Sequence, residues 1–447
     1  MLGEKETKTL YQDVLKRLGD DKAEVFITVE DEYLTRFANN YIHQNVAERE
    51  LTLTVKVTQG KRDGMAKTNR LDTGALDELV ERARASARTS PENPDHPGLA
   101  EPVEYQPVDA FDERTASFTP EERAEGVGEV CRMAKEKGLN AFGAFSTGTT
   151  EIVIGNSRGM FAYHVLTSAD LQTVVLENGG DASGWAQRSG WRVEDISTAE
   201  LGAEAVHKTE AGKGPRNIEP GEFIVVLDPY ATVDIIDRLN MYGMGALSVQ
   251  EGRSWMCERI GKQVMSPEVN IWDDGLDPKG MPLPFDFEGV PKKRTELIKG
   301  GKVIGPVYDR ATAFKDEKTS TGHGLPPFQR NFGGVAINLF MAPGDKTLEE
   351  MIHSTERGLY ITRFWYTRLV HPTDCGITGM TRDGTYLIED GKIVYPVKNL
   401  RFTQSYVDAL AGVEAIGKET QLLSDFGSAF CVPALKLRSF SFTGSTS

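Results

Sequence analysis

Apolar residues in the first half of the chain follow two different spacings. Spacing of three or four residues predicts helices over 6–18, 72–86, 119–137 and 198–208. Alternation of apolar and polar residues predicts short strands over 23–29, 33–38, 41–46, 50–59, 65–68, 151–154, 161–165 and 171–176. Five prolines between residues 91 and 107 predict an irregular surface connection. Residues 1–220 are therefore expected to form an α+β domain in which helices flank antiparallel strands.

A change of pattern follows residue 220. An apolar strand, 223–227, leads into Asp228-Pro229, which is typical of a helix start. Apolar residues then recur at helical spacing, which predicts one long helix running toward residue 264. Its expected apolar face is Val233, Ile235, Ile236, Leu239, Met241, Met244 and Leu247. Farther on, Gly300-Gly301 and Asp390-Gly391 predict tight hairpins. Residues 221–447 are therefore expected to form a mainly β domain with one central helix.

The composition narrows the class of protein. A chain of 447 residues is too long for one ordinary core, so two or three domains are expected. A net charge of −15 disfavours direct binding to nucleic acid. No apolar run approaches the roughly 20 residues that span a bilayer, and the N-terminus lacks the apolar core of a secretory signal. We therefore expect a cytoplasmic protein that binds no membrane.

The residues that could carry chemistry are few and scattered. Cys131, Cys257, Cys375 and Cys431 lie far apart, which predicts neither a disulfide framework nor a zinc ribbon. The strongest local cluster is His371-Pro-Thr-Asp374-Cys375, which could supply metal ligands or a Cys–His pair with help from elsewhere. His323 and His353 are the only histidines in the preceding hundred residues.

Two further interpretations concern loops. Gly322-His323-Gly324 fits a polar surface turn better than a ligand loop, and the surrounding segment 315–330 fits either a flexible flap or a disordered loop. A polar run within a strand-rich region is expected to face a groove. The resulting substrate-cleft candidates are Arg363, His371, Asp374, Cys375 and Arg382. Taken alone, these residues predict no named reaction.

Several segments in order along the chain resemble one known family. They are 35–45, 57–69, 154–159, 226–229 and 386–397. Together they are similar to the TldD/PmbA family, also called modulators of DNA gyrase. The resemblance implies a cytosolic zinc metalloprotease that works as a pair, in which TldD carries zinc and TldE, also called PmbA, does not.

The resemblance also identifies where a zinc site would lie. In zinc-bearing members, the helix after the Asp-Pro turn carries HExxxH, two histidines and a cysteine near the C-terminus hold zinc, and the glutamate is the base. The matching positions here are Asp237, Arg238 and Tyr242. No histidine or cysteine occurs between His207 and Cys257, and Cys431 is out of register with the third ligand, so we expect it to be a packed thiol.

Three hypotheses remain open. The favoured one is a non-catalytic TldE/PmbA-like subunit that needs no cofactor of its own, pairs with a zinc-bearing TldD-like homologue or with itself, and helps to hold an unfolded peptide. The second is an active metallopeptidase or hydrolase with unorthodox residues such as His371, Cys375 and His323. The third is a regulatory protein that binds gyrase or a toxin–antitoxin pair without proteolysis.

Overall fold

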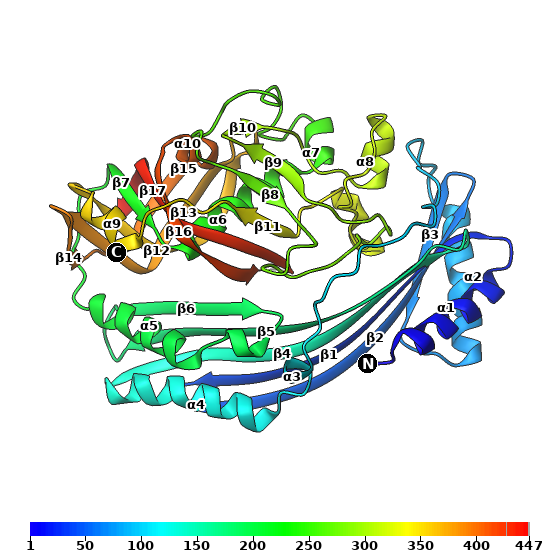
Figure 1. Cartoon of the computed structure of the whole chain (residues 1–447), viewed down its shortest axis with the longest axis horizontal. Coiled ribbons are helices and arrows are strands. Elements are labelled where there is room, and N and C mark those ends of the chain that lie inside the picture. The colour runs from blue at the N-terminus through cyan, green and yellow to red at the C-terminus, as the bar shows by residue number, and fades with distance from the viewer. Residues whose placement is uncertain (426, 446–447) are drawn as a thin grey trace.

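The protein is built from two β-sheets stacked face to face. The computed structural model describes residues 1–425 and 427–445. Figure 1 shows a long, curved N-terminal sheet lying below a C-terminal body of strands, short helices and loops. The N-terminal sheet is antiparallel and the C-terminal sheet is mixed, which confirms the predicted α+β class.

Six strands make the N-terminal sheet, in the order β3-β2-β1-β4-β5-β6. They are β1 (Lys22–Ala38), β2 (Tyr41–Gln59), β3 (Arg62–Thr68), β4 (Leu139–Asn156), β5 (Phe161–Glu177) and β6 (Ser183–Gly190). Several of them are much longer than predicted, because acidic and threonine stretches that lack an apolar alternation still pair on both sides. Glu30, for example, lies opposite Glu50 of β2 and Thr150 of β4.

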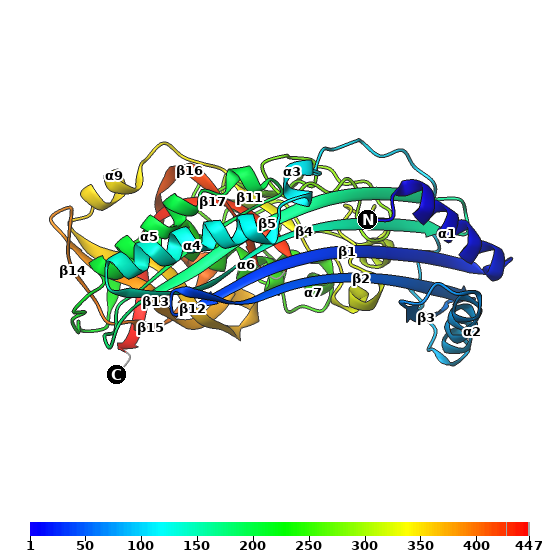
Figure 2. The same cartoon turned by 90° about the horizontal axis from the view of Figure 1, so that it is seen from below.

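Helices cover one face of this sheet. They are α1 (Glu4–Leu18), α2 (Thr73–Thr89), α3 (Glu113–Ala116), α4 (Pro120–Glu136) and α5 (Thr198–Ala211), with a 3₁₀ turn at Val193–Asp195. The predicted caps are present, since Asp72 accepts a hydrogen bond from the Ala75 amide and Thr119 forms a capping box with Glu122. Figure 2 shows α4 and α5 side by side along one part of the sheet and α1 and α2 at its far end.

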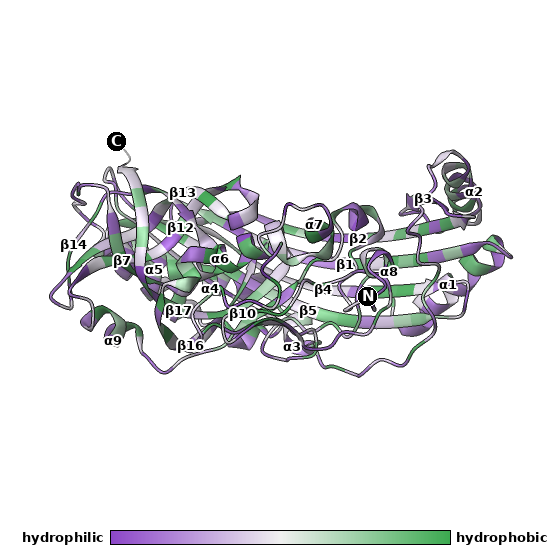
Figure 3. Ribbon diagram, turned by 90° about the horizontal axis from the view of Figure 1, so that it is seen from above, coloured by the Kyte–Doolittle hydropathy of each residue, from purple (hydrophilic) through white to green (hydrophobic). Residues whose placement is uncertain are grey.

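Successive side chains along each strand point to opposite faces of the N-terminal sheet. Val25, Ile27 and Val29 of β1 pack with α1 and α2, whereas Phe26 faces the C-terminal body and packs with Leu283 and Phe285. The alternation of apolar and polar residues along the long strands is visible in Figure 3. The concave face of the sheet is thus available for contacts with the second body.

Eleven strands make the C-terminal sheet. They are β7 (Glu222–Leu227), β8 (Ile271–Asp273), β9 (Thr295–Lys299), β10 (Lys302–Val303), β11 (Asn338–Met341), β12 (Arg357–His371), β13 (Gly376–Glu389), β14 (Lys392–Pro396), β15 (Leu400–Ser405), β16 (Val413–Asp425) and β17 (Ser428–Ser445). Both predicted hairpins form, with positive φ angles at Gly300, Gly301, Asp390 and Gly391.

The remaining helices of the C-terminal body are short. They are α6 (Pro229–Leu239), α7 (Ala246–Gln250), α8 (Arg310–Lys315), α9 (Leu348–His353) and α10 (Tyr406–Ala411), with 3₁₀ turns at Pro327–Phe332 and Pro372–Asp374. Within the described residues, no helix is both long and apolar enough to cross a membrane.

The prediction of one long helix toward residue 264 is wrong. Helix α6 passes into a π-helical turn, Asn240–Met244, and the chain becomes extended at Gly245 before α7. The wider π turn shifts the helical phase, and Met241, which was expected on the apolar face, is 52% exposed. Trp255 packs so closely on Gly243 that a Cβ there would lie 2.0 Å from its ring. The break in the helix therefore coincides with the close packing of Trp255 on Gly243.

Candidate functional site

Helix α6 begins at a tightly held aspartate. Asp228 follows β7 in the middle of the large core, and its Oδ1 accepts a hydrogen bond from the Tyr230 amide. Its Oδ2 accepts one from the Tyr360 hydroxyl at 2.8 Å and lies 3.4 Å from the Lys208 ammonium. This anchoring fixes where the following turns of α6 place their side chains.

Two aspartates and one arginine share the polar side of α6. Arg238 Nη1 lies 3.2 Å from Asp237 Oδ2, and Arg238 Nε lies 3.8 Å from Asp234 Oδ2. The Thr367 hydroxyl of β12 accepts a hydrogen bond from Arg238 Nε and donates one to Asp234. Tyr406 of α10 donates a further hydrogen bond to Asp234 at 2.6 Å. One guanidinium is therefore held between two carboxylates, in a network that spans three elements.

The two carboxylates titrate unusually. Burial, with smaller contributions from Asp234 and Asp425, raises the pKa of Asp237 to about 7 against the opposing effect of the Arg238 cation. Burial also raises the pKa of Asp234, although Arg238 and the hydroxyls of Tyr406 and Thr367 favour its charged form. Sequence reasoning missed Asp234 and Thr367. The spacing of four residues between Asp234 and Arg238 could have indicated the first, but only strand packing reveals the second.

The three positions that the family resemblance matches to the zinc motif carry side chains that do not suit zinc. A zinc site uses neutral imidazoles, thiolates or carboxylates that converge on the ion. Here Asp237 is already paired with Arg238, whose guanidinium is a permanent cation at the place of the motif's base. Tyr242 lies in the π turn and packs against the large core. Within residues 1–425 and 427–445, no group of three or more His, Cys, Asp or Glu side chains could hold a metal ion.

The structure separates the residues of the local cluster at 371–375. His371 is exposed, whereas Cys375 is fully buried in the large core. Burial, with Asp374 and Asp234 nearby, raises the pKa of the Cys375 thiol, which disfavours the reactive thiolate. Asp374 accepts a hydrogen bond from the Gly376 amide and so stabilises its own turn. His371 and Cys375 are close in the sequence but do not form a Cys–His pair.

His323 is not on the surface. Its side chain is fully buried, and its Nε2 lies 2.9 Å from Asp273 Oδ1, which also pairs with the buried Lys292. The expectation of a polar surface turn at this histidine is therefore wrong, because a buried carboxylate draws the ring inward. Cys431 is also buried, on β17 between Phe340 of β11 and Leu422 of β16, and burial raises its pKa.

Two of the cleft candidates meet on an aromatic surface. Arg363 of β12 and Arg382 of β13 are direct cross-strand partners. The Arg363 guanidinium lies 4.0 Å from the ring centre of Trp185 and 4.7 Å from that of Trp365, and Arg382 lies 5.4 Å from Trp365. Trp365 is 42% exposed. This cation–aromatic platform could stack planar peptide groups. The register of β12 and β13 places Trp365 beside the two arginines, whereas Trp185 comes from β6 of the other sheet.

Family models describe this chain in three segments. The model of the PmbA/TldA metallopeptidase C-terminal domain matches residues 220–444, that of domain 1 matches 23–87, and that of the central domain matches 113–212.

Individual relatives span nearly the whole chain. A metalloprotease TldD homolog of Haemophilus influenzae is 22% identical, with 95% of this chain and 91% of the relative covered. The metalloprotease PmbA of Escherichia coli O157:H7 is 25% identical, with 86% and 85% covered. Names from both branches of the family thus occur among the relatives, and sequence similarity does not separate the two.

Solved structures share the fold. TldE from Thermococcus kodakarensis superposes with a TM-score of 0.89 at 18% identity, covering 98% of this chain and all 100% of that one. A modulator of a DNA gyrase from Thermotoga maritima superposes with a TM-score of 0.87 at 20% identity, with the same coverage. The fold seen here is therefore that of both proteins from end to end.

Proposed function

The chain belongs to the PmbA/TldD metallopeptidase family, and on that premise we propose that it is a non-catalytic, TldE-like subunit of a two-chain peptidase. In this proposal a zinc-bearing, TldD-like homologue supplies the metal and the base. The present chain completes the complex in the cytoplasm and helps to hold an unfolded peptide.

One observation carries the proposal: the ion pair between Asp237 and Arg238 at the positions of the zinc motif. The Arg238 guanidinium lies 3.2 Å from Asp237 and would repel a divalent cation brought to that carboxylate. Arg238 cannot serve as a general base, because its side chain stays protonated at any working pH. The helix is retained, but its polar side is used for an internal network.

The exposed platform on β12 supports the peptide-holding part of the proposal. The guanidinium groups of Arg363 and Arg382 lie 4.7 and 5.4 Å from the ring centre of Trp365. Such a surface can stack on peptide groups or aromatic side chains. Arg363 is already paired with the buried Asp383 at 3.2 Å, so the more exposed Arg382 is the one that can bind a peptide carboxylate. It includes no nucleophile, which suits binding better than cleavage.

The decisive experiment combines a pull-down with metal analysis. The tagged chain is purified alone and together with a TldD-like homologue from the same organism, and zinc and cleavage of an unfolded peptide are measured for each sample. We expect less than about 0.1 zinc per chain when it is alone, because the matching positions offer no ligand set. Cleavage is expected only from the mixture.

Other outcomes would replace the proposal with an alternative. Stoichiometric zinc in the isolated chain, lost in His371→Ala, would favour an active hydrolase. Copurification with gyrase or with a toxin–antitoxin pair, without cleavage by any mixture, would favour the regulatory role. A chain that forms only homodimers and never binds the homologue would contradict the subunit role.

A matched variant tests the metal argument directly. The triple change Asp237→His, Arg238→Glu and Tyr242→His restores the zinc motif on the same helix and turn. If the three side chains alone prevent metal binding, the variant gains zinc affinity while the parent chain does not. Circular dichroism of both proteins checks that the fold is kept.

A further inference from the structure

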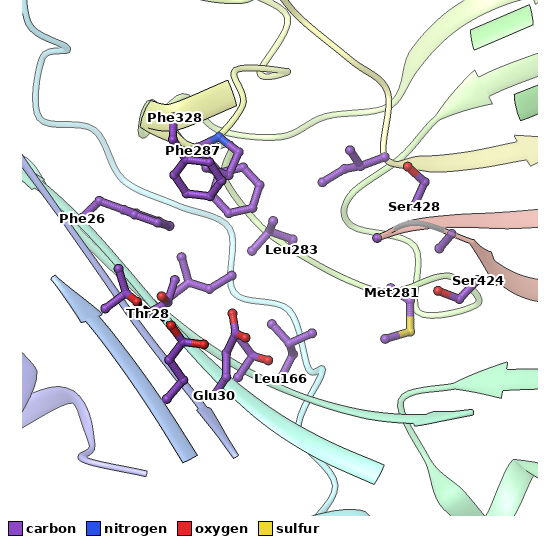
Figure 4. Close-up of a pocket in the computed structure, with 18 of the residues that line it drawn as sticks. Phe26, Thr28, Glu30, Leu166, Met281, Leu283, Phe287, Phe328, Ser424 and Ser428 are labelled. Carbon is purple, nitrogen blue, oxygen red and sulfur yellow. Dashed lines mark hydrogen bonds between the residues drawn. The ribbon is translucent and has the colours of Figure 1, made fainter. Parts of the chain in front are cut away.

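A cavity of about 530 Å³ lies between the concave face of the N-terminal sheet and the C-terminal body. Its apolar wall combines Phe26 of β1, Ile152 of β4 and Leu166 of β5 with Leu283, Phe287 and Phe328 of the opposite loops. Figure 4 shows the rings of Phe287 and Phe328 together at one end, with Leu283 between them and the Glu30 end. The volume falls within the range of small-ligand sites.

The floor of the cavity changes from apolar to acidic along one strand. Phe26, Thr28 and Glu30 point the same way from β1 because successive side chains alternate between faces. Thr28 lies between Thr52 and Ile152, and Glu30 lies between Glu50 and Thr150. Four residues of strand span about 13 Å. A ligand of three to four extended residues would therefore reach from the aromatic end to the acidic end.

Two glutamates on neighbouring strands form the acidic end of the cavity. Glu30 and Glu50 are direct cross-strand partners and both line the cavity. Burial raises the pKa of Glu30, and the charges of Glu50 and Glu32 raise it further. Lys67 lines the same cavity, yet among the described residues no ammonium or guanidinium lies within 4.0 Å of either glutamate. Like charges placed directly opposite each other on a sheet destabilise it.

A bound cation would relieve this repulsion. An ammonium or guanidinium group between the two carboxylates would form charge-assisted hydrogen bonds with Glu30 and Glu50, which are both exposed at this end of the cavity. Phe328, which is 55% exposed, would be covered by an apolar group at the other end. The cavity thus complements a molecule that carries a cation and a large apolar group about 13 Å apart.

From this complementarity we infer that the cavity binds a peptide segment whose Lys or Arg side chain lies between Glu30 and Glu50 while an aromatic or large aliphatic residue packs against Phe287 and Phe328. The inference rests on the proposed function only in taking a peptide as the occupant. It concerns the space between the two sheets and is separate from the α6 network.

The test uses dye-labelled hexapeptides and the isolated full-length chain, with fluorescence anisotropy as the readout. One peptide has a phenylalanine and, three positions later, a lysine; matched peptides carry glutamine or glutamate in place of the lysine. We expect affinity for the lysine peptide to exceed that for the glutamine peptide by on the order of tenfold. The glutamate peptide should bind more weakly than either.

Two double variants make the test specific. Glu30→Gln with Glu50→Gln removes the acidic pair that lines the cavity. Glu32→Gln with Glu48→Gln also removes two negative charges, but from the next pair of facing residues on the same face of the sheet. The first should abolish the preference for lysine and should melt at the same temperature as the parent chain or higher, because repulsion is removed. The second should keep most of the preference.

Three results would overturn the inference: equal binding of the lysine and glutamine peptides, an unchanged preference in the Glu30→Gln/Glu50→Gln variant, or butylamine competing as well as the peptide. The same samples, assayed for zinc and for pairing with the homologue, test the subunit role separately. A failure of one proposal is therefore distinguishable from a failure of the other.

Discussion

Two buried charge networks in this molecule combine carboxylates with cations, but they shift the pKa of a carboxylate in opposite directions. Where the two sheets meet, Glu24 of β1 is paired with Lys56 of β2 and with Arg330, whose Nη1 lies 2.7 Å away. On α6, by contrast, Asp237 and Asp234 both pair with the same cation, Arg238. The cations hold the pKa of Glu24 well below its usual range, whereas the pKa of Asp237 is raised to about 7.

The number of cations beside each carboxylate accounts for the difference. Glu24 lies beside two, although Arg330 is shared with Glu288 and Lys56 with Asp63, whereas Arg238 is the cation paired with Asp237 among the described residues. Burial opposes the charged form in both places. Two cations more than offset this effect at Glu24, while a shared cation does not at Asp237. The Glu24 network is suited to holding the two halves of the molecule together. The α6 network leaves Asp237 partly protonated near pH 7.

The largest expected effect comes from breaking the network between the sheets. Arg330→Met removes the ion pair with Glu24 and the hydrogen bond donated to the Phe287 carbonyl. Leaving buried carboxylates without this partner should lower the free energy of unfolding by about 3–5 kcal/mol. Urea unfolding at pH 7.5 measures the loss. The exposed pair Arg62–Glu92 provides the control, since Arg62→Met should cost less than about 1 kcal/mol.

A smaller effect is expected from the corresponding change on α6. Arg238→Met leaves Asp234 and Asp237 without their shared cation, but Asp237 can become protonated at modest cost because its pKa is already about 7. We expect a loss of about 2–3 kcal/mol at pH 7.5 that shrinks at pH 5.5. Unfolding curves at both pH values test this. A loss as large as that of Arg330→Met at both pH values would contradict the charge-sharing account.

Local signals in the sequence predicted the long helices of the N-terminal half and both hairpins, since caps at Asp72 and Thr119 and the turns at 300–301 and 390–391 act over a few residues. The same signals predicted strands that are shorter than those in the structure. The division into domains at residue 220 and the cleft role of Arg363 and Arg382 stay predictions.

The networks could not be predicted in the same way, because they join distant segments. Arg330 and Glu24 are 306 residues apart, and Thr367 reaches Asp234 only because β12 packs along α6. The burial of His323, which lies in a loop, depends on Asp273 of β8. The match of Asp237, Arg238 and Tyr242 to the zinc motif stays a prediction from family resemblance, and the pairing of Asp237 with Arg238 required the fold.

The pH dependence of stability should have opposite signs at the two carboxylates. The raised pKa of Asp237 means that the folded protein binds this proton more tightly than the unfolded chain, where the value is near 3.8. Its contribution is therefore fully present below about pH 4 and is lost as the pH rises through 7. Glu24, whose pKa is lowered, stabilises the fold above its unfolded pKa of 4.5, and this contribution is lost as the pH falls.

Two variants separate these contributions. Asp237→Asn should remove about 1–3 kcal/mol of pH dependence between pH 4 and 7, whereas Glu24→Gln should destabilise most at pH 7 and least in acid. Thermal unfolding across pH 4–8 measures both, with Glu92→Gln as an exposed control. Parallel pH profiles of the two variants would show that charge balance does not distinguish the networks.

The smallest expected effect tests whether hydrogen bonds, rather than charge alone, hold the α6 network together. Thr367→Val keeps the shape of the side chain but removes the hydroxyl that accepts from Arg238 at 3.1 Å and donates to Asp234 at 2.8 Å. Losing this bridge should cost about 1–2 kcal/mol and should raise the pKa of Asp234, because its charged form loses a donor. Urea unfolding and carboxyl-carbon NMR titration give the two values. Tyr406 still donates to Asp234 in the variant, so a loss approaching that of Arg238→Met would mean that the threonine, not the arginine, organises this side of α6.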